Sequence, residues 1–99
     1  MHANPGIVFR DGATGRRAAV AGGPDVWEVV ALLRGLRGDV DARVGRAARQ
    51  LGLPVRQVRA ASRYYAAFAE EIEAEIAANE TAADHELAVW EAERQLLSG

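Results

Sequence analysis

Arginine residues between positions 39 and 63 are the side chains whose type and spacing most directly indicate chemistry. Arg56, Arg59 and Arg63 recur at intervals of three and four, which places them on one face of a helix with Gln57 at its flank. A guanidinium binds guanine through two parallel hydrogen bonds, and an amide suits adenine in the same way. The pattern predicts a surface that reads base edges in the major groove of DNA.

The segment just before supplies Arg43, Arg46 and Arg49 at three-residue spacing. Arginines on a neighbouring helix are suited to phosphate contacts, which fix the register of a protein on DNA without reading its sequence. The alternative is an arginine-rich face that is only solvated. Both interpretations remain open at this point.

These arginines need two helices at an angle, and "DVDARVGRAARQLGLPVRQVRAASRYYAAF" supplies them. Asp39 or Asp41 is expected to cap a first helix, the sequence 52–54 (Gly-Leu-Pro) to end it, and Val55 to begin a second. Two helices joined by a short turn containing Gly form a helix-turn-helix unit. The expected inner face of the first helix consists of Val40, Val44, Ala47, Ala48 and Leu51.

Upstream of this unit, apolar runs at 7–9 and 18–21 flank the turn-rich "RDGATG" and predict a small β-hairpin. In "PDVWEVVALLRGLRG", Asp25 and Glu28 have the spacing of a capping box, and Gly38 suits the end of the helix. The apolar stripe of that helix is Val26, Val29, Val30, Leu33 and Leu36. The expected fold is mainly α: a helix-turn-helix core with a small N-terminal β-hairpin and a long C-terminal helix.

Charge divides the chain into two parts. The range 1–63 contains 11 Arg and 5 acidic residues, a net of +6, whereas the range 64–99 contains 1 Arg and 9 acidic residues, a net of −8. Such polarity is typical of a molecule with one anionic and one cationic partner. The alternative is that the two halves neutralise each other, within one chain or across a dimer.

The acidic part has apolar residues three or four positions apart and no internal Gly or Pro. The 28 residues of the range 70–97 would span about 42 Å as a helix, with a bend expected near Ala69 or Asn79. A globule of the remaining residues would be only about 25 to 30 Å across. The helix should therefore overhang, and its stripe needs a second copy of the chain or a groove on another protein.

Two segments, "GRRAAVAGGPDVWEVV" and "AARQLGLPVRQVRAASRYYAAFAEEIEAEIAANE", together cover about Gly15 to Glu80. They resemble the small antitoxins of VapB type that occur beside PIN-domain ribonuclease toxins. Two positions depart from the family pattern. The sequence at 22–24 is Gly-Gly-Pro where Gly-Thr-Arg is frequent, which leaves the docking of the hairpin open. Ala69 stands where Pro is expected, which suggests little break between the second helix of the unit and the tail.

The resemblance implies a DNA-binding and dimerisation domain over residues 1–68 and a toxin-binding helical tail over residues 69–99. Its implied partners are operator DNA, which it would bind as a homodimer and autorepressor, and the cognate PIN-domain ribonuclease, with which it would form a hetero-oligomer. The toxin-binding residues would be Ile72, Ile76, Leu87, Trp90, Arg94 and Leu97.

The acidic side chains of the tail would mimic RNA phosphate along the basic rim of the toxin. Arg94 would enter the carboxylate cluster of the nuclease and displace its metal ions. The alternative for Arg94 is an exposed partner of Trp90 or Glu91. The wider alternative is a homodimeric helix-turn-helix regulator, or an interaction module, without a toxin partner.

Composition argues against several other classes of function. The chain has no cysteine, and His85, Glu71 and Glu75 lie on a densely acidic helix where solvation is the usual state. No nucleophile, metal or phosphate-loop spacing is present, so we expect neither catalysis nor a cofactor. Without a signal segment or a long apolar run, a cytoplasmic protein that does not enter the membrane is expected.

Overall fold

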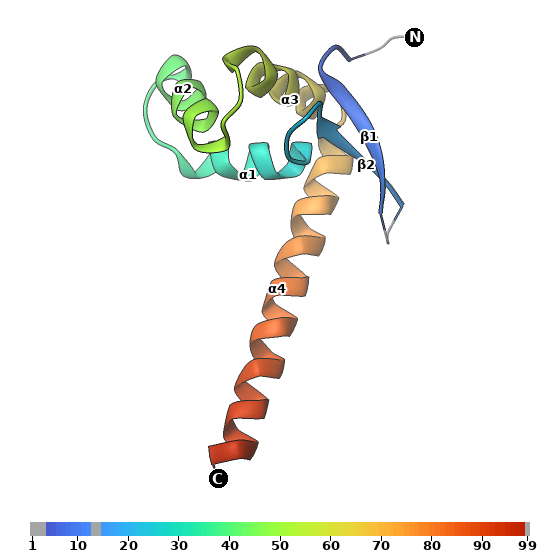
Figure 1. Cartoon of the computed structure of the whole chain (residues 1–99), viewed down its shortest axis with the longest axis vertical. Helices are drawn as coiled ribbons and strands as arrows, with labels where there is room; N and C mark the ends of the chain where they lie inside the picture. Colours follow the sequence, from blue (N-terminus) through green and yellow to red (C-terminus); the bar gives the residue numbers. More distant parts are fainter. Residues whose placement is uncertain (1–3, 13–14, 99) are drawn as a thin grey trace.

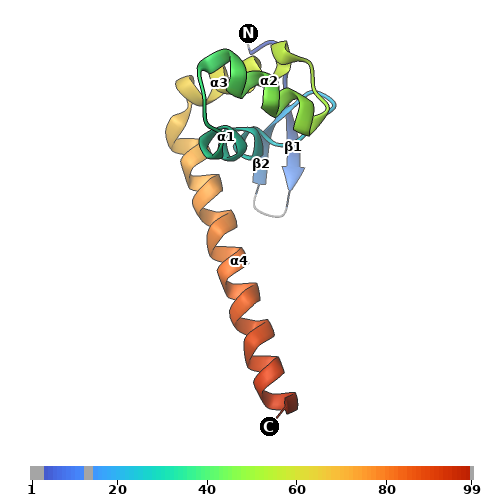
Figure 2. The ribbon, with the colours of Figure 1, turned by 90° about the vertical axis from the view of Figure 1, so that its left-hand side faces the viewer.

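The computed structural model describes residues 4–12 and 15–98, and it has the expected mainly α architecture (Figure 1). Two antiparallel strands are followed by three short helices and one long helix. The molecule measures 55 × 32 × 23 Å because the long helix projects from the compact part (Figures 1 and 2). The elements are β1 (Ile7–Gly12), β2 (Gly15–Val20), α1 (Val26–Gly35), α2 (Val40–Leu51), α3 (Val55–Ala67) and α4 (Ala69–Ser98).

The hairpin is confirmed, with Ile7 of β1 opposite Val20 of β2. The end of β2 is buried, whereas most of β1 is exposed, so β2 is the strand that joins the core. The backbone N–H of Ala21 donates to the carbonyl of Gly6 at 2.8 Å, and that of Val20 donates to Pro24 at 2.9 Å. The first bond extends the ladder between β1 and β2, and the second joins β2 to the segment just before α1.

Helix α1 begins as its sequence indicates. The backbone N–H of Asp25 donates to Oε2 of Glu28 at 2.9 Å, which is the reciprocal half of the expected capping box. The helix ends at Gly35 with Leu36 as its C-cap, so the expected end at Gly38 was wrong. A side chain of α2 explains the early end: Arg43 donates to the carbonyl of Leu33 at 2.6 Å and satisfies a last-turn acceptor.

Helices α2 and α3 form the expected helix-turn-helix unit. Oδ1 of Asp39 accepts from the backbone N–H of Ala42 at 2.8 Å, and Gly52 ends α2 in the left-handed region at φ 67°. Buried side chains between the helices are Val44, Ala47, Ala48, Val58 and Ala61, with Leu51 packed beside them. Val40 was wrongly placed on the inner face: it is 61% exposed, because it is the first residue of α2 and lies outside the crossing with α3.

Phe68 separates α3 from α4. Its backbone, at φ −133° and ψ 45°, leaves the helical region, so the bend expected near Ala69 falls one residue earlier. The helix α4 then continues without a break through Asn79. Helices α3 and α4 are therefore separate elements with different directions, although Ala69 in place of Pro suggested less of a break between them (Figure 1).

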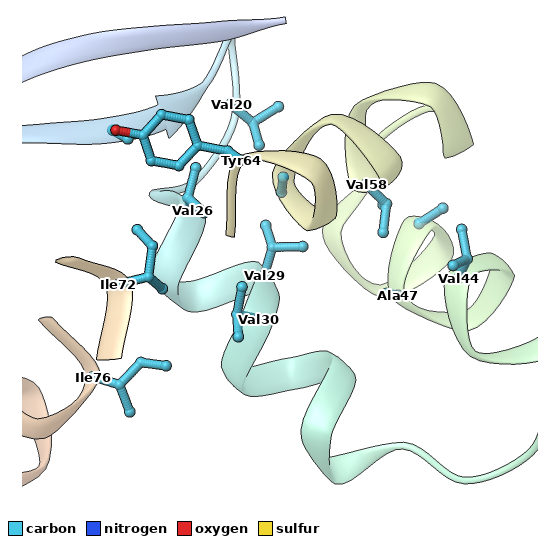
Figure 3. Packing of buried hydrophobic residues seen from close by; sticks show 13 residues of the cluster. Val20, Val26, Val29, Val30, Val44, Ala47, Val58, Tyr64, Ile72 and Ile76 are labelled. Carbon is cyan, nitrogen blue, oxygen red and sulfur yellow. The ribbon is translucent and has the colours of Figure 1, made fainter. Parts of the chain in front are cut away.

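The first two turns of α4 belong to the core of the compact part. Ile72 is fully buried and Ile76 is nearly so, and Figure 3 shows both side chains directed toward Val26 and Val30 of α1. The compact part therefore extends beyond residue 68 as far as Ile76. Every described residue from 77 to 98 is exposed.

A polar contact between three helices fixes the direction of α4. Arg34 of α1 donates to Oε1 of Glu73 of α4 at 3.0 Å and to the hydroxyl of Tyr65 of α3 at 3.0 Å. The Tyr65 hydroxyl in turn donates to Glu73. Hydrogen bonding to the Arg34 guanidinium and to Tyr65 lowers the pKa of the Glu73 carboxyl below its usual value. We call Arg34, Tyr65 and Glu73 the helix clamp.

Replacing Ile72 with Ala should lower the free energy of unfolding by about 2 to 5 kcal/mol, because it opens a cavity where α4 meets α1. Chemical denaturation measures this change. Leu96→Ala is the matched control, since Leu96 is 79% exposed and should change stability by less than about 0.5 kcal/mol. Equal effects of the two substitutions would contradict the docking of α4.

Candidate nucleic-acid interface and protein-binding helix

The outer face of α3 carries the exposed arginines of the helix-turn-helix unit. Arg56 and Arg63 are exposed, and no ion pair involves either one within the described residues. Arg59 is half-buried and its guanidinium lies 2.8 Å from Oδ1 of Asp41 on α2. Two guanidiniums on this face are thus free to meet an anion, and a third is held by a surface carboxylate.

A shallow hollow of about 220 Å³ lies between these arginines. Four residues of α3 line it from one side, and Pro5 and Gly6 line it from the other; the four are Arg56, Gln57, Ala60 and Arg63. A Cβ on Gly6 would come within 3.3 Å of the Ala60 Cβ, so glycine permits this close approach of the N-terminal backbone to α3. The expected recognition face is therefore formed by α3 together with the chain just before β1.

Gln57 lies at the edge of this face, where it lines the hollow and also contacts the loop after β2. Its side-chain amide donates to the carbonyl of Ala21 at 2.9 Å, in a half-buried position between α3 and the loop after β2. The contact of Gln57 with a base stays a prediction, and in this conformation its amide is engaged by Ala21. The helical angle placed it at the flank, and the hairpin occupies that flank.

Arg43 is also used inside the fold. Its guanidinium reaches the carbonyl of Leu33, and its Nε is buried. It links α2 to the end of α1, and its contact with a phosphate stays a prediction. Arg46 and Arg49 are exposed, although the Arg46 guanidinium also donates to the carbonyl of Arg37.

Sequence reasoning missed a cluster of charges at the start of α1. The Asp25 side chain is only 10% exposed and pairs with two arginines of the hairpin. Oδ2 of Asp25 lies 3.1 Å from Nε of Arg17, and Oδ1 lies 3.6 Å from Nη1 of Arg10. Two of the eleven arginines counted in the basic half therefore neutralise a buried carboxylate. No local spacing indicates these pairs, which form only when the hairpin folds onto α1.

Glu75 of α4 lies near the same cluster. Its Oε1 is buried and has no hydrogen-bond partner among the described residues. Burial raises the pKa of the Glu75 carboxyl above its usual value, and the charges of Glu71 and Asp25 add to the effect. In its charged form Glu75 therefore opposes the docking of α4, which depends on the helix clamp and on Ile72 and Ile76.

The structure divides the expected toxin-binding residues into two groups. Ile72 and Ile76 are buried against α1 and are not available to a partner, so including them was wrong for this conformation. Leu87, Trp90 and Leu97 are 54%, 51% and 78% exposed on the projecting part of α4. The exposed apolar surface of the tail thus begins well beyond its junction with the compact part.

Arg94 stacks on Trp90, with its guanidinium carbon 4.6 Å from the ring centroid. The two residues are one turn apart, so this is the neighbour contact anticipated as the alternative to a metal-displacing role. The stacking leaves the donors of the guanidinium exposed at the end of α4.

Within residues 4–12 and 15–98, no cluster of three His, Asp or Glu side chains has the geometry of a metal site. In the same residues, no helix is both long enough and apolar enough to cross a membrane. Compared with known proteins, the chain matches no family model, no curated protein and no solved structure. Any assignment of function therefore depends on the side chains described above and on the resemblance in the sequence.

Arg43→Ala should lower the free energy of unfolding by about 1 to 3 kcal/mol, because it removes a hydrogen bond from a charged donor to the Leu33 carbonyl. Thermal and chemical denaturation measure this loss. Arg49→Ala removes the same charge from an exposed position of the same helix and should change stability by less than about 0.5 kcal/mol. If Arg43→Ala leaves the free energy of unfolding unchanged, the role of Arg43 in joining α2 to α1 would be contradicted.

Proposed function

We propose that this protein is the antitoxin of a type II toxin–antitoxin system. Its projecting C-terminal helix neutralises a PIN-domain ribonuclease, and its helix-turn-helix unit binds operator DNA as an autorepressor. The observation that carries the proposal is the projecting part of α4, which leaves Leu87, Trp90 and Leu97 in solvent while the compact part has a complete core.

The exposed apolar residues support a protein partner for the tail. An isolated helix of this length is marginal in water, and most helical stability comes from burying an apolar face. Within the described residues that face has no cover beyond Ile76. A helix with an exposed apolar face, attached to a folded domain, is suited to a groove on another protein.

Charge supports a cationic partner surface. The range 77–98 carries five acidic side chains and one arginine. A ribonuclease must attract RNA phosphate to its active site, so a basic rim is the expected complement of this helix. The proposal also places Arg94 in the carboxylate cluster of the nuclease. Because Arg94 stacks on Trp90, binding of Trp90 by the nuclease would bring Arg94 close to the same surface.

The DNA-binding part of the proposal is supported by the helix-turn-helix unit and by Arg56 and Arg63 on the outer face of α3. A dimer would present two such faces to a palindromic operator. Within the described residues β1 pairs on one side only, and Val8 and Phe9 on it are exposed. That open strand edge is the surface that supports dimer formation.

Replacing both Arg56 and Arg63 with Ala should weaken binding to DNA from the promoter of its own operon. The logarithmic salt dependence of the binding constant should become less steep by about 2, roughly one for each cation removed from the interface. Salt-titrated fluorescence anisotropy with a labelled duplex measures both quantities. The control is Arg37→Ala with Arg94→Ala, which removes the same charge elsewhere and should leave the salt dependence nearly unchanged.

An affinity of the parent protein that is indifferent to salt would contradict the DNA-binding role. Equal losses in the two double variants would attribute the effect to net charge and would remove the outer face of α3 from the proposal.

If an adjacent gene encodes a PIN-domain protein, Trp90→Ala should weaken binding to that protein by about 2 kcal/mol or more, as expected for a buried aromatic anchor. Arg94→Ala should cost clearly less. Isothermal titration calorimetry on the co-purified pair measures both losses, and relief of nuclease inhibition should follow the same order. Neither residue belongs to the core, so both variants should keep their fold.

Negligible losses in both variants would remove the tail from the mechanism. If the adjacent gene product does not bind at all, the remaining interpretation is a homodimeric helix-turn-helix regulator or interaction module without a toxin partner.

A further inference from the structure

Three exposed apolar residues on the projecting part of α4 have the spacing of a seven-residue repeat. Leu87, Trp90 and Leu97 are three and seven residues apart, as at positions a and d of a coiled coil, and these positions can be numbered through the range 80–97. The residues at these positions are Glu80, Ala83, Leu87, Trp90, Arg94 and Leu97. We call this set the seam; all its members are exposed.

The seam continues the face by which α4 docks on the compact part. Ile76 lies one repeat before Ala83 and is buried against α1, and Glu73 of the helix clamp lies one repeat before Glu80. In an unbroken helix these positions share one face. The clamp therefore fixes the rotation of α4 about its axis, and with it the direction in which the seam faces.

The four e and g positions within the range 80–97 are all acidic. Asp84 and Glu91 occupy the e positions, and Glu86 and Glu93 occupy the g positions. In a parallel pair g faces e of the other helix, and in an antiparallel pair e faces e and g faces g. Either arrangement of two copies sets carboxylate against carboxylate, which is destabilising. Pairing of the tail with a second copy of itself is therefore disfavoured, although Leu87, Trp90 and Leu97 of the seam are exposed in the described residues.

We infer that residues 80–97 form one strand of a heteromeric coiled coil, whose other strand is a partner helix with Lys or Arg at its e and g positions. This inference deepens the proposed function, because it names the kind of element that the ribonuclease would present. The partner helix would lie along the side of α4 that faces α1.

The polar members of the seam restrict the register of that partner. Glu80 and Arg94 lie at opposite ends of the seam and carry opposite charges. Charged residues at a positions reduce stability but favour one alignment over others, because a shifted helix would leave them unpaired. Trp90 and Leu87 between them supply the apolar contact.

The test uses full-length protein and a labelled peptide of about 21 residues, three heptads, with Leu at a and d and Lys at e and g. A second peptide differs only in having Glu at e and g. The Lys peptide should bind about a hundredfold more tightly than the Glu peptide, because four flanking pairs change from repulsive to attractive. Fluorescence anisotropy measures both affinities.

Two variants with equal net charge separate the seam from the total charge of the tail. Glu86→Lys with Glu93→Lys reverses the g positions and should weaken the Lys peptide about tenfold. The second variant makes the same change in net charge on the outer positions b and f, and should alter the affinity by less than about threefold. Its substitutions are Thr81→Lys, His85→Lys, Ala92→Lys and Gln95→Lys. Circular dichroism checks that both variants keep their helix content.

Equal binding of the two peptides, no binding of either, or an equal loss in both variants would overturn the inference. None of these outcomes involves the ribonuclease. If the protein prefers the Lys peptide but does not bind the adjacent gene product, the coiled-coil inference stands and the antitoxin proposal fails. If the protein binds the nuclease but does not prefer the Lys peptide, the antitoxin proposal stands and the coiled-coil inference fails.

Discussion

The packing of Ile72 and Ile76 against α1, reinforced by the helix clamp, is the contact on which the rest of the molecule depends. It completes the core with residues from the far end of the chain, and it sets the direction in which α4 leaves the compact part. Because about two turns of a thirty-residue helix are docked, the remainder has no contact that could bend it back. The exposed apolar surface of the tail is a direct consequence of that geometry.

The arginines fall into two groups, those that bond within the fold and those that remain on the surface. Arg43, Arg17 and Arg10 hold elements of the compact part together, whereas Arg56 and Arg63 stay on the surface. The internal arginines satisfy a helix-end carbonyl or a buried carboxylate, each of which would be costly to leave without a partner. A count of basic residues therefore overstates the charge that is available to an anionic partner. The surface that remains is smaller and is confined to the outer face of the helix-turn-helix unit.

Most secondary structure could be predicted because its signals are local. Asp25 and Asp39 cap helices, Gly52 ends one, and the alternation around "RDGATG" gives a hairpin. The candidate site was predicted less well. Gln57 has the type and the angle of a base-reading residue, but its amide lies within reach of the Ala21 carbonyl thirty-six residues away. Helical periodicity reports which side a residue occupies and carries no information about which other element covers that side.

The sequence by itself determined the four helices, the hairpin, the charge polarity and the repeat that places Leu87, Trp90 and Leu97 on one face of the tail. These properties follow from neighbours within a few positions, where backbone preference and side-chain spacing act. Only the tertiary structure decided that Ile72 and Ile76 belong to the core and that the tail becomes free after them. That outcome depends on contacts between α1 and α4, some forty residues apart in the chain, which local periodicity does not encode.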